Sequence, residues 1–332
     1  MGYKVKKLRA ETKVRRAKYI LFAVVFAFVA ALCIVSAIYP AASWKYYFGL
    51  PEMGNRKEGQ LRVHFLDVGQ GDATILEFPD GKTALIDGGP SDGDSVKSLM
   101  RYLNALNVDE IDFLVATHCD DDHCGGLVEA LKYKKVKRAY LPAGVSATVS
   151  ESYAAFYEAV VAEKCEVVYA SRSTNAIVGE TYPYELHFLH PYTLDVEEGE
   201  AGESENSIVT WLDYEGVSAL FCGDIDETTE LALKRDYELG TLDRKGVALN
   251  ETEILKVAHH GSAYSSCEEF LSVLNVKDAV ISCGKGNAYG HPSERVLSSL
   301  AGVGANVYRT DEAGHILATI AADGKYTIDK LN

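Results

Sequence analysis

The chain has 332 residues, of which 47% are hydrophobic, so it can bury the core of one large domain or of two small ones. Its formal net charge is −15, but residues 1–18 hold eight Lys and Arg residues and one acid, which leaves a charge of −22 on the rest. So acidic a body is a poor general trap for nucleic acid, whose binding depends largely on neutralising phosphates, although metal ions or a local basic patch can still bind a phosphodiester.

The first predicted element is an apolar helix. The 21 residues from Tyr19 to Tyr39 carry no charge, which is long enough to span a bilayer, and Pro40 ends the helix. The basic residues 1–18, which we expect to be unstructured, predict a cytoplasmic tail and an extracytoplasmic body. Small residues at 36–42 also fit a cleaved signal peptide, but the long apolar run favours an uncleaved anchor.

A polar linker, residues 40–60, leads into a soluble domain, residues 61–332. The aromatic residues near the start of this linker are typical of a membrane interface: Trp44, Tyr46, Tyr47 and Phe48.

The soluble domain mixes hairpins with strand–helix alternation, which predicts an α/β sandwich with helices outside a central pair of sheets. We predict strands at 61–66, 73–78, 83–86, 111–116, 138–141, 166–169, 185–189, 208–214, 219–222, 254–258, 278–282, 305–309 and 316–320. We predict helices at 95–106, 127–132, 151–164, 227–236, 266–274 and 293–301. Ser265 and Ser266, each followed three residues later by Glu, could form a capping box for helix 266–274.

A cluster of histidines and aspartates follows the strand at 111–116. It contains His118, Asp120, Asp121, Asp122 and His123, and Gly125–Gly126 follow. Imidazoles suit Zn and Mn, while carboxylates can neutralise and bridge two divalent ions. A solvated acidic turn would explain neither the histidines at both ends nor the paired glycines, so the cluster predicts a metal site. Cys119 and Cys124 could be ligands too, but we expect them to be packing residues.

Other predicted strands also end in residues that could bind metal or phosphate. Cys222-Gly223-Asp224 places a carboxylate after an apolar strand, and His259-His260 follows the strand at 254–258. The Gly-rich loop from Gly284 to Ser293 opens a helix and contains Lys285 and His291, a pattern that favours an anion.

The pattern His118-x-Asp120-x-Asp122-His123-x-Gly-Gly resembles the first metal motif of the metallo-β-lactamase superfamily. It is most similar to the ComEC-like version found in the soluble domain of bacterial DNA-uptake proteins and in free-standing relatives. Asp120 stands where β-lactamases carry a second histidine, which argues against a β-lactamase. The resemblance covers about 61–322 and implies an αββα sandwich, here preceded by one transmembrane helix.

The resemblance also implies two divalent ions, Zn or Mn, and a distribution of ligands. The first ion would be held by His118, Asp120 and Asp224, and the second by Asp122, His123, Asp224 and His260. Of the adjacent histidines, we assign His260 as the ligand and His259 as a substrate-facing acid, with the exchanged assignment kept open. His291 would contact the phosphate or protonate the leaving oxygen, and Asp122 is a further catalytic candidate.

The remaining site candidates lie in turns that match the same family. We expect Asp67 and Asp87 to support the metal-binding histidines from behind, since a bound imidazole needs its other nitrogen held. Either His190 or Asn206 could complete the first metal site or orient substrate. The other substrate-binding candidates are Gln70, Asp72, Ser262 and Lys285. His64, His187 and His315 fit no motif, and we expect them to be structural.

The sequence therefore predicts a single-pass membrane protein with an extracytoplasmic, metal-dependent hydrolase domain. The resemblance implies a phosphodiesterase or nuclease that acts on DNA, bound to the membrane by its N-terminal helix and without an obligate protein partner. One alternative is a phosphoesterase that acts on cell-envelope phosphodiesters such as choline-decorated teichoic acid, which suits the acidic body. Another is a metal-stabilised binding module without turnover.

Overall fold

The computed structural model describes residues 2–143, 150–194 and 206–331, and it divides into two compact units, 1–48 and 49–332. The first unit consists of helix α1 (Gly2–Ile38) and the short 3₁₀ helix η1 (Ala41–Tyr46). Within α1, Thr12–Ala37 is long and apolar enough to cross a membrane, and by this test it fits an anchor and a signal sequence equally.

The expectation that residues 1–18 are unstructured was wrong, because α1 begins at Gly2 and runs through the basic stretch without a break. Lys, Arg, Ala and Glu are good helix formers, and no Gly or Pro interrupts the sequence until Pro40. The helix ends two residues before Pro40, as the restricted backbone before a proline dictates.

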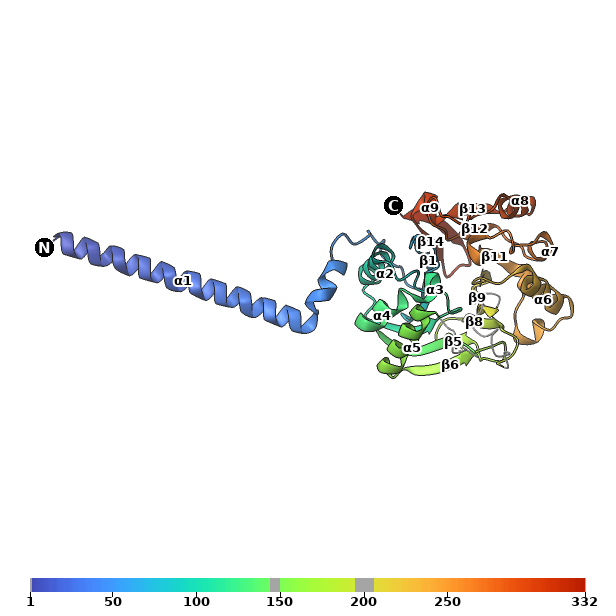
Figure 1. Cartoon of the computed structure of the whole chain (residues 1–332), viewed down its shortest axis with the longest axis horizontal. Helices are drawn as coiled ribbons and strands as arrows, with labels where there is room; N and C mark the ends of the chain where they lie inside the picture. The colour runs from blue at the N-terminus through green and yellow to red at the C-terminus, as the bar shows by residue number, and fades with distance from the viewer. Residues whose placement is uncertain (1, 144–149, 195–205, 332) are drawn as a thin grey trace. The chain divides into compact units, whose positions relative to one another are not determined.

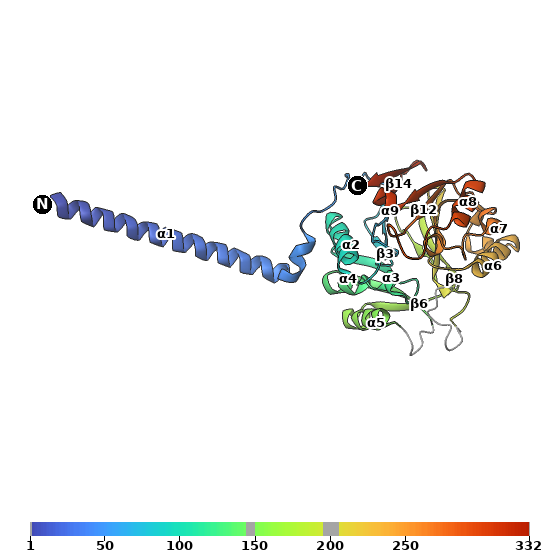
Figure 2. The same cartoon turned by 45° about the horizontal axis from the view of Figure 1, so that its top comes forward.

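The second unit contains two mixed β-sheets that pack face to face between helices (Figures 1 and 2). In order across the first sheet, the strands are β15 (Tyr326–Leu331), β14 (His315–Ile320), β1 (Leu61–Phe65), β2 (Thr74–Glu77), β3 (Thr83–Ile86), β4 (Glu110–Val115), β5 (Lys135–Pro142) and β6 (Glu166–Ala170). The second sheet contains β13 (Asn306–Arg309), β12 (Asp278–Ile281), β11 (Thr252–Lys256), β10 (Val217–Phe221), β9 (Val209–Tyr214), β8 (Tyr184–His190) and β7 (Ile177–Val178).

Helices lie on the outer face of each sheet, as the αββα expectation required (Figure 2). The first sheet is flanked by α2 (Gly93–Ala105), α3 (Asp121–Cys124), α4 (Leu127–Tyr133) and α5 (Glu151–Glu163). The second is flanked by α6 (Glu227–Glu238), α7 (Glu268–Leu271) and α8 (Glu294–Gly302). Shorter helices are α9 (Thr310–Ala313), η3 (Asp243–Lys245), η4 (Leu249–Glu251) and η5 (Ala258–Gly261).

The main hydrophobic core fills the space between the two sheets. It joins residues of the first sheet, such as Phe65, to residues of the second, such as Phe188 and Phe221. The rings of Phe78 and Tyr184 stack across this space with their centroids 4.3 Å apart. A second core packs β9 to β12 against α6, α7 and α8. The sheets are thereby fixed on both faces, which makes their edges a rigid base for functional loops.

Helix α7 differs from its prediction. It runs only from Glu268 to Leu271, its N-cap is Cys267, and neither predicted capping box forms. Instead, the buried Glu230 of α6 accepts hydrogen bonds from the backbone N–H groups of Ser266, at 2.6 Å, and Cys267, at 2.9 Å. A carboxylate 36 residues away in sequence therefore replaces the local cap. The edge strand β15 is a further element that the sequence pattern did not indicate.

Candidate metal centre

The predicted metal-binding segments meet at one edge of the two sheets. Strands β3 and β4 are parallel neighbours in the first sheet, and β10, β11 and β12 are parallel neighbours in the second. Parallel strands bring the loops that follow them to a common edge, where α/β proteins place their ligands. The loops after these strands contain Asp87, His118, Asp224, His260 and His291.

The first motif turns sharply after β4 into the one-turn helix α3. The turn packs backbone to backbone against the loop after β3, and Gly126 N–H donates to the Gly89 carbonyl at 2.8 Å. A Cβ atom on Gly126 would lie 2.0 Å from the carbonyl oxygen of Gly88, so only glycine allows this approach. The paired glycines after the metal motif therefore hold His123 and the neighbouring Asp87 loop together.

Four side chains gather their donor atoms around one point. His123 Nε2 lies 3.2 Å from Asp224 Oδ1 and 3.3 Å from His260 Nε2. His260 Nε2 lies 3.3 Å from Asp122 Oδ2 and 3.5 Å from Asp224 Oδ2. Donors about 2.1 Å from a tetrahedral Zn²⁺ stand about 3.4 Å from one another, which is close to these separations. Ligand atoms of Asp72, His123, Asp224 and His260 all lie within 4.8 Å of one another, so this buried group could hold a divalent ion.

A second half-site adjoins the first through Asp224. His118 Nε2 lies 3.5 Å from Asp120 Oδ2 and 4.0 Å from Asp224 Oδ2. The buried His118 Nε2 and Asp224 Oδ1 have no hydrogen-bond partner within the part of the chain that the structure describes. Buried polar atoms are rarely left unsatisfied, so these two atoms are suited to bind a cation. Asp224 reaches both halves, as a bridging carboxylate must.

The electrostatics of the cluster favour charged groups. Burial alone would lower the pKa of His123, but the carboxylates of Asp224 and Asp87 outweigh it and raise that pKa well above its ordinary value. Burial likewise opposes the charge on His260, yet Asp224 and Asp72 raise its pKa to about 10. The pKa of Asp224 is correspondingly held well below its ordinary value by His123 and His260, against the effect of burial. Protonated His123 and His260 thus supply positive charge at the place where a bound metal ion would otherwise supply it.

Side chains behind the two histidines that follow β4 hold their Nδ1 atoms, and Asp87 is one of these supports, as we expected. Its Oδ2 lies 2.8 Å from His123 Nδ1 and accepts from the Thr117 hydroxyl at 2.7 Å, which fixes His123 with Nε2 toward the cluster. His118 Nδ1 lies 3.0 Å from Thr117 Oγ1 and 3.2 Å from Ser207 Oγ. The sequence reasoning did not single out Thr117 or Ser207 as supports, because a hydroxyl at a strand end has no distinctive spacing.

Asp72 supports His260 in the same manner. It is 4% exposed, its Oδ1 lies 3.3 Å from His260 Nδ1, and its Oδ2 forms an ion pair with Lys256 Nζ at 2.7 Å. The Ser282 carbonyl also lies 3.0 Å from His260 Nδ1. These contacts place Asp72 against the His260 ring and within the group of residues that could hold a metal ion, whereas we had expected it to face substrate. Lys256, itself buried, is a further residue that sequence reasoning missed.

The adjacent histidines after β11 occupy different environments. Both have left-handed backbone conformations, with φ of 49° at His259 and 54° at His260, which is uncommon for residues other than glycine. The His260 side chain is 2% exposed and points into the cluster, whereas that of His259 is 32% exposed, with Nε2 3.7 Å from Asp224 Oδ2. This geometry favours His260 as the ligand and His259 as the substrate-facing group.

The loop after β12 brings His291 over the cluster. Its ring centroid lies 5.8 Å from that of His259 and 6.3 Å from that of His260. Asn287 fixes the loop: its Oδ1 accepts from His291 N–H at 3.0 Å, and its Nδ2 donates to the carbonyls of His291 and Gly284. Gln70, expected to bind substrate, accepts from Gly284 N–H at 3.0 Å and anchors the start of this loop.

The other predicted site residues lie around the cluster. His190 is buried, and its Nδ1 lies 2.9 Å from the carbonyl of Ser207, the residue that contacts His118. Asn206 is half-buried beside Ser207, Ser262 is buried just after the two histidines, and Lys285 is exposed on the loop after β12. Asp67 does not contact a cluster histidine; its backbone N–H donates to His315 Nδ1 at 3.0 Å. Cys119 and Cys124 are buried, which suits packing residues.

The family model for the metallo-beta-lactamase superfamily matches residues 66–285, two thirds of the chain. The chain belongs to the metallo-β-lactamase superfamily. The αββα fold and the resemblance inferred from the metal motif are both confirmed by this match.

Two named bacterial proteins are similar to this chain over about three quarters of its length. The chain is 30% identical over 269 residues to ComE operon protein 3 of Bacillus subtilis (strain 168), a match covering 76% of this chain and 32% of that protein. It is 28% identical over 257 residues to Competence protein ComA of Neisseria gonorrhoeae, covering 77% and 32%. This superfamily member thus spans about a third of the length of these relatives.

Among solved structures, the metallo-beta-lactamase fold protein YhfI from Bacillus subtilis matches with a TM-score of 0.48 and 9% identity, over 81% of this chain and 100% of that chain. The family match and the similarity to these relatives place the chain in the superfamily, and its buried His/Asp cluster could hold a metal ion.

Proposed function

We propose that the chain is a membrane-anchored, extracytoplasmic phosphodiesterase that uses two divalent ions, Zn or Mn, with DNA as its substrate. The observation that carries the proposal is the position of Asp224 between two donor sets. One set is His118 with Asp120, and the other is Asp122 with His123 and His260. Two-ion sites joined by a carboxylate are typical of enzymes that cleave phosphate esters by in-line attack.

Divalent ions bound here would supply a water activated near neutral pH and charge that neutralises the phosphoryl oxygens. The protein's own contribution is to hold the donors and to shape the approach. Asp87 and Asp72 orient His123 and His260 through their second ring nitrogens. Preset donors need no rearrangement when charge develops during the reaction, which is a large part of enzymatic rate enhancement.

The substrate side is assigned to His259 and His291, whose rings meet edge to face with their centroids 5.8 Å apart. Burial, with further contributions from His260 and His259, lowers the pKa of His291, so we assign a neutral His291 to donate a hydrogen bond to a phosphoryl oxygen. The partly exposed His259 Nε2 is assigned to deliver the proton to the leaving oxygen. Lys285 adds positive charge on the same loop.

Similarity to competence proteins supports DNA as the substrate, whereas the charge of −22 outside residues 1–18 favours a less extended polyanion. We would therefore compare the full chain, in neutral detergent and loaded with Mn or Zn, on single-stranded DNA and on a choline-bearing teichoic acid. His291→Gln would serve as the impaired variant, and Asp329→Asn, an exposed change on β15, as the matched control.

Preferential cleavage of DNA, reduced in His291→Gln and unchanged in Asp329→Asn, is the expected result. Release of phosphorylcholine without DNA cleavage would replace DNA by an envelope substrate at the same centre. Stoichiometric metal binding without turnover on either substrate would contradict the hydrolase proposal and support a metal-stabilised binding module.

A further inference from the structure

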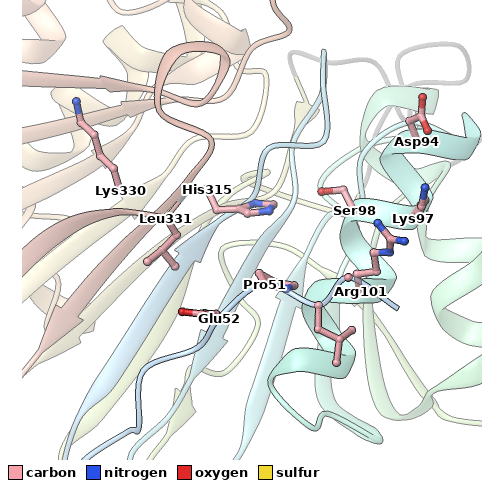
Figure 3. A pocket seen from close by; sticks show the side chains of 11 residues that line it. Pro51, Glu52, Asp94, Lys97, Ser98, Arg101, His315, Lys330 and Leu331 are labelled. Atoms are coloured by element: carbon pink, nitrogen blue, oxygen red, sulfur yellow. The ribbon is translucent and has the colours of Figure 1, made fainter. Parts of the chain in front are cut away.

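A separate cavity of about 730 Å³ lies on the second unit (Figure 3). Its walls come from residues 49–52, helix α2, the start of β14 and the end of β15. None of its lining residues is a donor of the metal cluster. Its volume is that of a small-molecule site, well above what a single inorganic ion needs.

Two cations on one face of α2 line this cavity. Lys97 and Arg101 are one helical turn apart and both are half-buried. In the described ranges neither side chain has a hydrogen bond or an ion pair, and the buried Arg101 Nε has no partner. A Cβ atom on Gly49 would lie 3.6 Å from Arg101 Nη1, so the chain at Gly49 passes close to the guanidinium. A half-buried guanidinium without a partner lowers the stability of the folded state unless an anion binds to it.

His315 supplies a donor from the opposite wall. Its Nδ1 accepts the backbone N–H of Asp67 at 3.0 Å, so the neutral ring carries its proton on Nε2. Burial lowers the pKa of His315, which keeps this neutral form at pH 7. Figure 3 shows the ring directed toward the α2 side chains. Ser98 of α2 donates to the Asp67 carbonyl at 2.6 Å. The turn at Asp67 therefore contacts both α2 and His315, which form opposite walls of the cavity.

The distribution of charge within the cavity favours an anion. The two acids on its lining, Glu52 and Asp94, are exposed, whereas Lys97 and Arg101 lie deeper. Lys330 adds an exposed cation from β15.

We propose that this cavity binds a phosphate group, held by the Arg101 guanidinium, the Lys97 ammonium and the His315 Nε2–H, and carried on a larger molecule. The planar fork of arginine binds two phosphate oxygens at once, and a lysine and an imidazole from other directions suit a tetrahedral anion better than a flat carboxylate. The cavity volume leaves room for the rest of a phosphorylated metabolite or a lipid headgroup. The site goes beyond the proposed catalytic function.

The first test is calorimetric titration of the metal-free full chain, in neutral detergent, with inorganic phosphate. Saturable binding to one site is expected. Arg101→Gln should weaken it about tenfold or more, because a charge-assisted hydrogen bond is lost, and Arg101→Lys should weaken it less. The control is Lys135→Gln, which removes an exposed charge outside the cavity. Equal affinity in Arg101→Gln and Lys135→Gln would overturn the proposal.

Two further readouts locate the ligand and identify its source. The imidazole NMR signals of His315 should shift on adding phosphate, and their insensitivity would overturn the proposal even if a variant fails to fold. Binding that requires added metal and ignores Arg101→Gln would place phosphate at the metal centre instead. Tighter binding of short-chain phosphatidic acid than of glycerol-3-phosphate would identify a lipid headgroup, and the reverse order a soluble phosphate, both in keeping with the site.

Discussion

At the scale of single residues, the metal centre depends on carboxylates that orient imidazoles. Asp87 touches His123 Nδ1 at 2.8 Å and also accepts from the backbone N–H and hydroxyl of Thr117. With its Nδ1 held in this way, His123 has only Nε2 available for the metal cluster. A support behind a metal-binding histidine typically contributes 10- to 100-fold in metal affinity.

We predict that Asp87→Asn lowers metal affinity by about 10- to 100-fold while the fold is retained. The amide can no longer serve as an anionic acceptor for His123 Nδ1–H. Competition with a chromophoric chelator measures the affinity, and Asp329→Asn on the exposed face of β15 provides the control. Unchanged affinity in Asp87→Asn would remove its assigned role.

The raised pKa values of His123 and His260 lead to a prediction about pH. Their folded values lie above the ordinary 6.5, so the stability they contribute without metal is fully present below pH 6.5 and is lost as pH rises toward about 10. Metal must displace these protons, so apparent metal affinity should rise with pH from 6 to 9. Titration calorimetry in buffers of different ionisation enthalpy should detect about one to two protons released per chain at pH 7. No proton release would contradict the assigned ligands.

Sequence reasoning was strongest where residue types with special chemistry follow one another closely. His118 to His123 could be identified as a cluster without knowing the fold, because two histidines and three aspartates within six positions have no other common explanation. The role of His259 could not be separated from that of His260, since the predicted strand does not continue there. The left-handed turn of η5 decides which ring is buried, and that turn depends on packing against the loop after β12.

At the scale of elements, long-range partners replace some of the local signals. Helix α7 was expected to be capped by its own serine and glutamate residues, but Glu230 of α6 caps it instead. The Lys256–Asp72 ion pair joins β11 to the turn after β1 in the same way. Such pairs are set by the packing of the two sheets, so the spacing of residues along the chain does not reveal them.

We predict that Glu230→Ala lowers the free energy of unfolding by about 2 kcal/mol, since two buried N–H groups lose their acceptor. Glu238→Ala, on the same helix but in an exposed pair with Lys234, should change it by less than about 1 kcal/mol. Denaturant unfolding of the full chain in detergent compares the two. Similar losses would show that the helix, not the cap, determines the effect.

The loop after β12 should affect turnover more than metal binding. Asn287→Ala removes the contacts that hold His291 over the cluster, so we predict a fall in kcat of about tenfold or more with metal content unchanged. Asn250→Ala, at an exposed position in η4, is the matched control. Loss of bound metal in Asn287→Ala, measured by elemental analysis, would show that the loop supports the ligands instead of the substrate.

At the scale of the whole molecule, a long apolar helix precedes an acidic domain of the metallo-β-lactamase superfamily. The apolar span could be predicted from the sequence, but the helix extends further, through residues 1–18. We had expected this basic stretch to be unstructured, although a high density of positive charge does not by itself exclude a helix. If α1 is an uncleaved anchor, the mature protein should keep its N-terminus and remain in the membrane fraction after a high-salt wash. A mature chain that begins near residue 40 and is released without detergent would identify a signal peptide.

We propose that two ions make the domain a phosphodiesterase and that they are held by His118, Asp120, Asp122, His123, Asp224 and His260. The most direct test strips the full chain of metal, reloads it with Mn or Zn, and follows metal content together with hydrolysis of bis-p-nitrophenyl phosphate, in wild type and Asp224→Asn. We predict about two ions per chain and metal-dependent turnover in the wild type, with both reduced in the variant. Full turnover in Asp224→Asn, or none in the wild type with two ions bound, would contradict it.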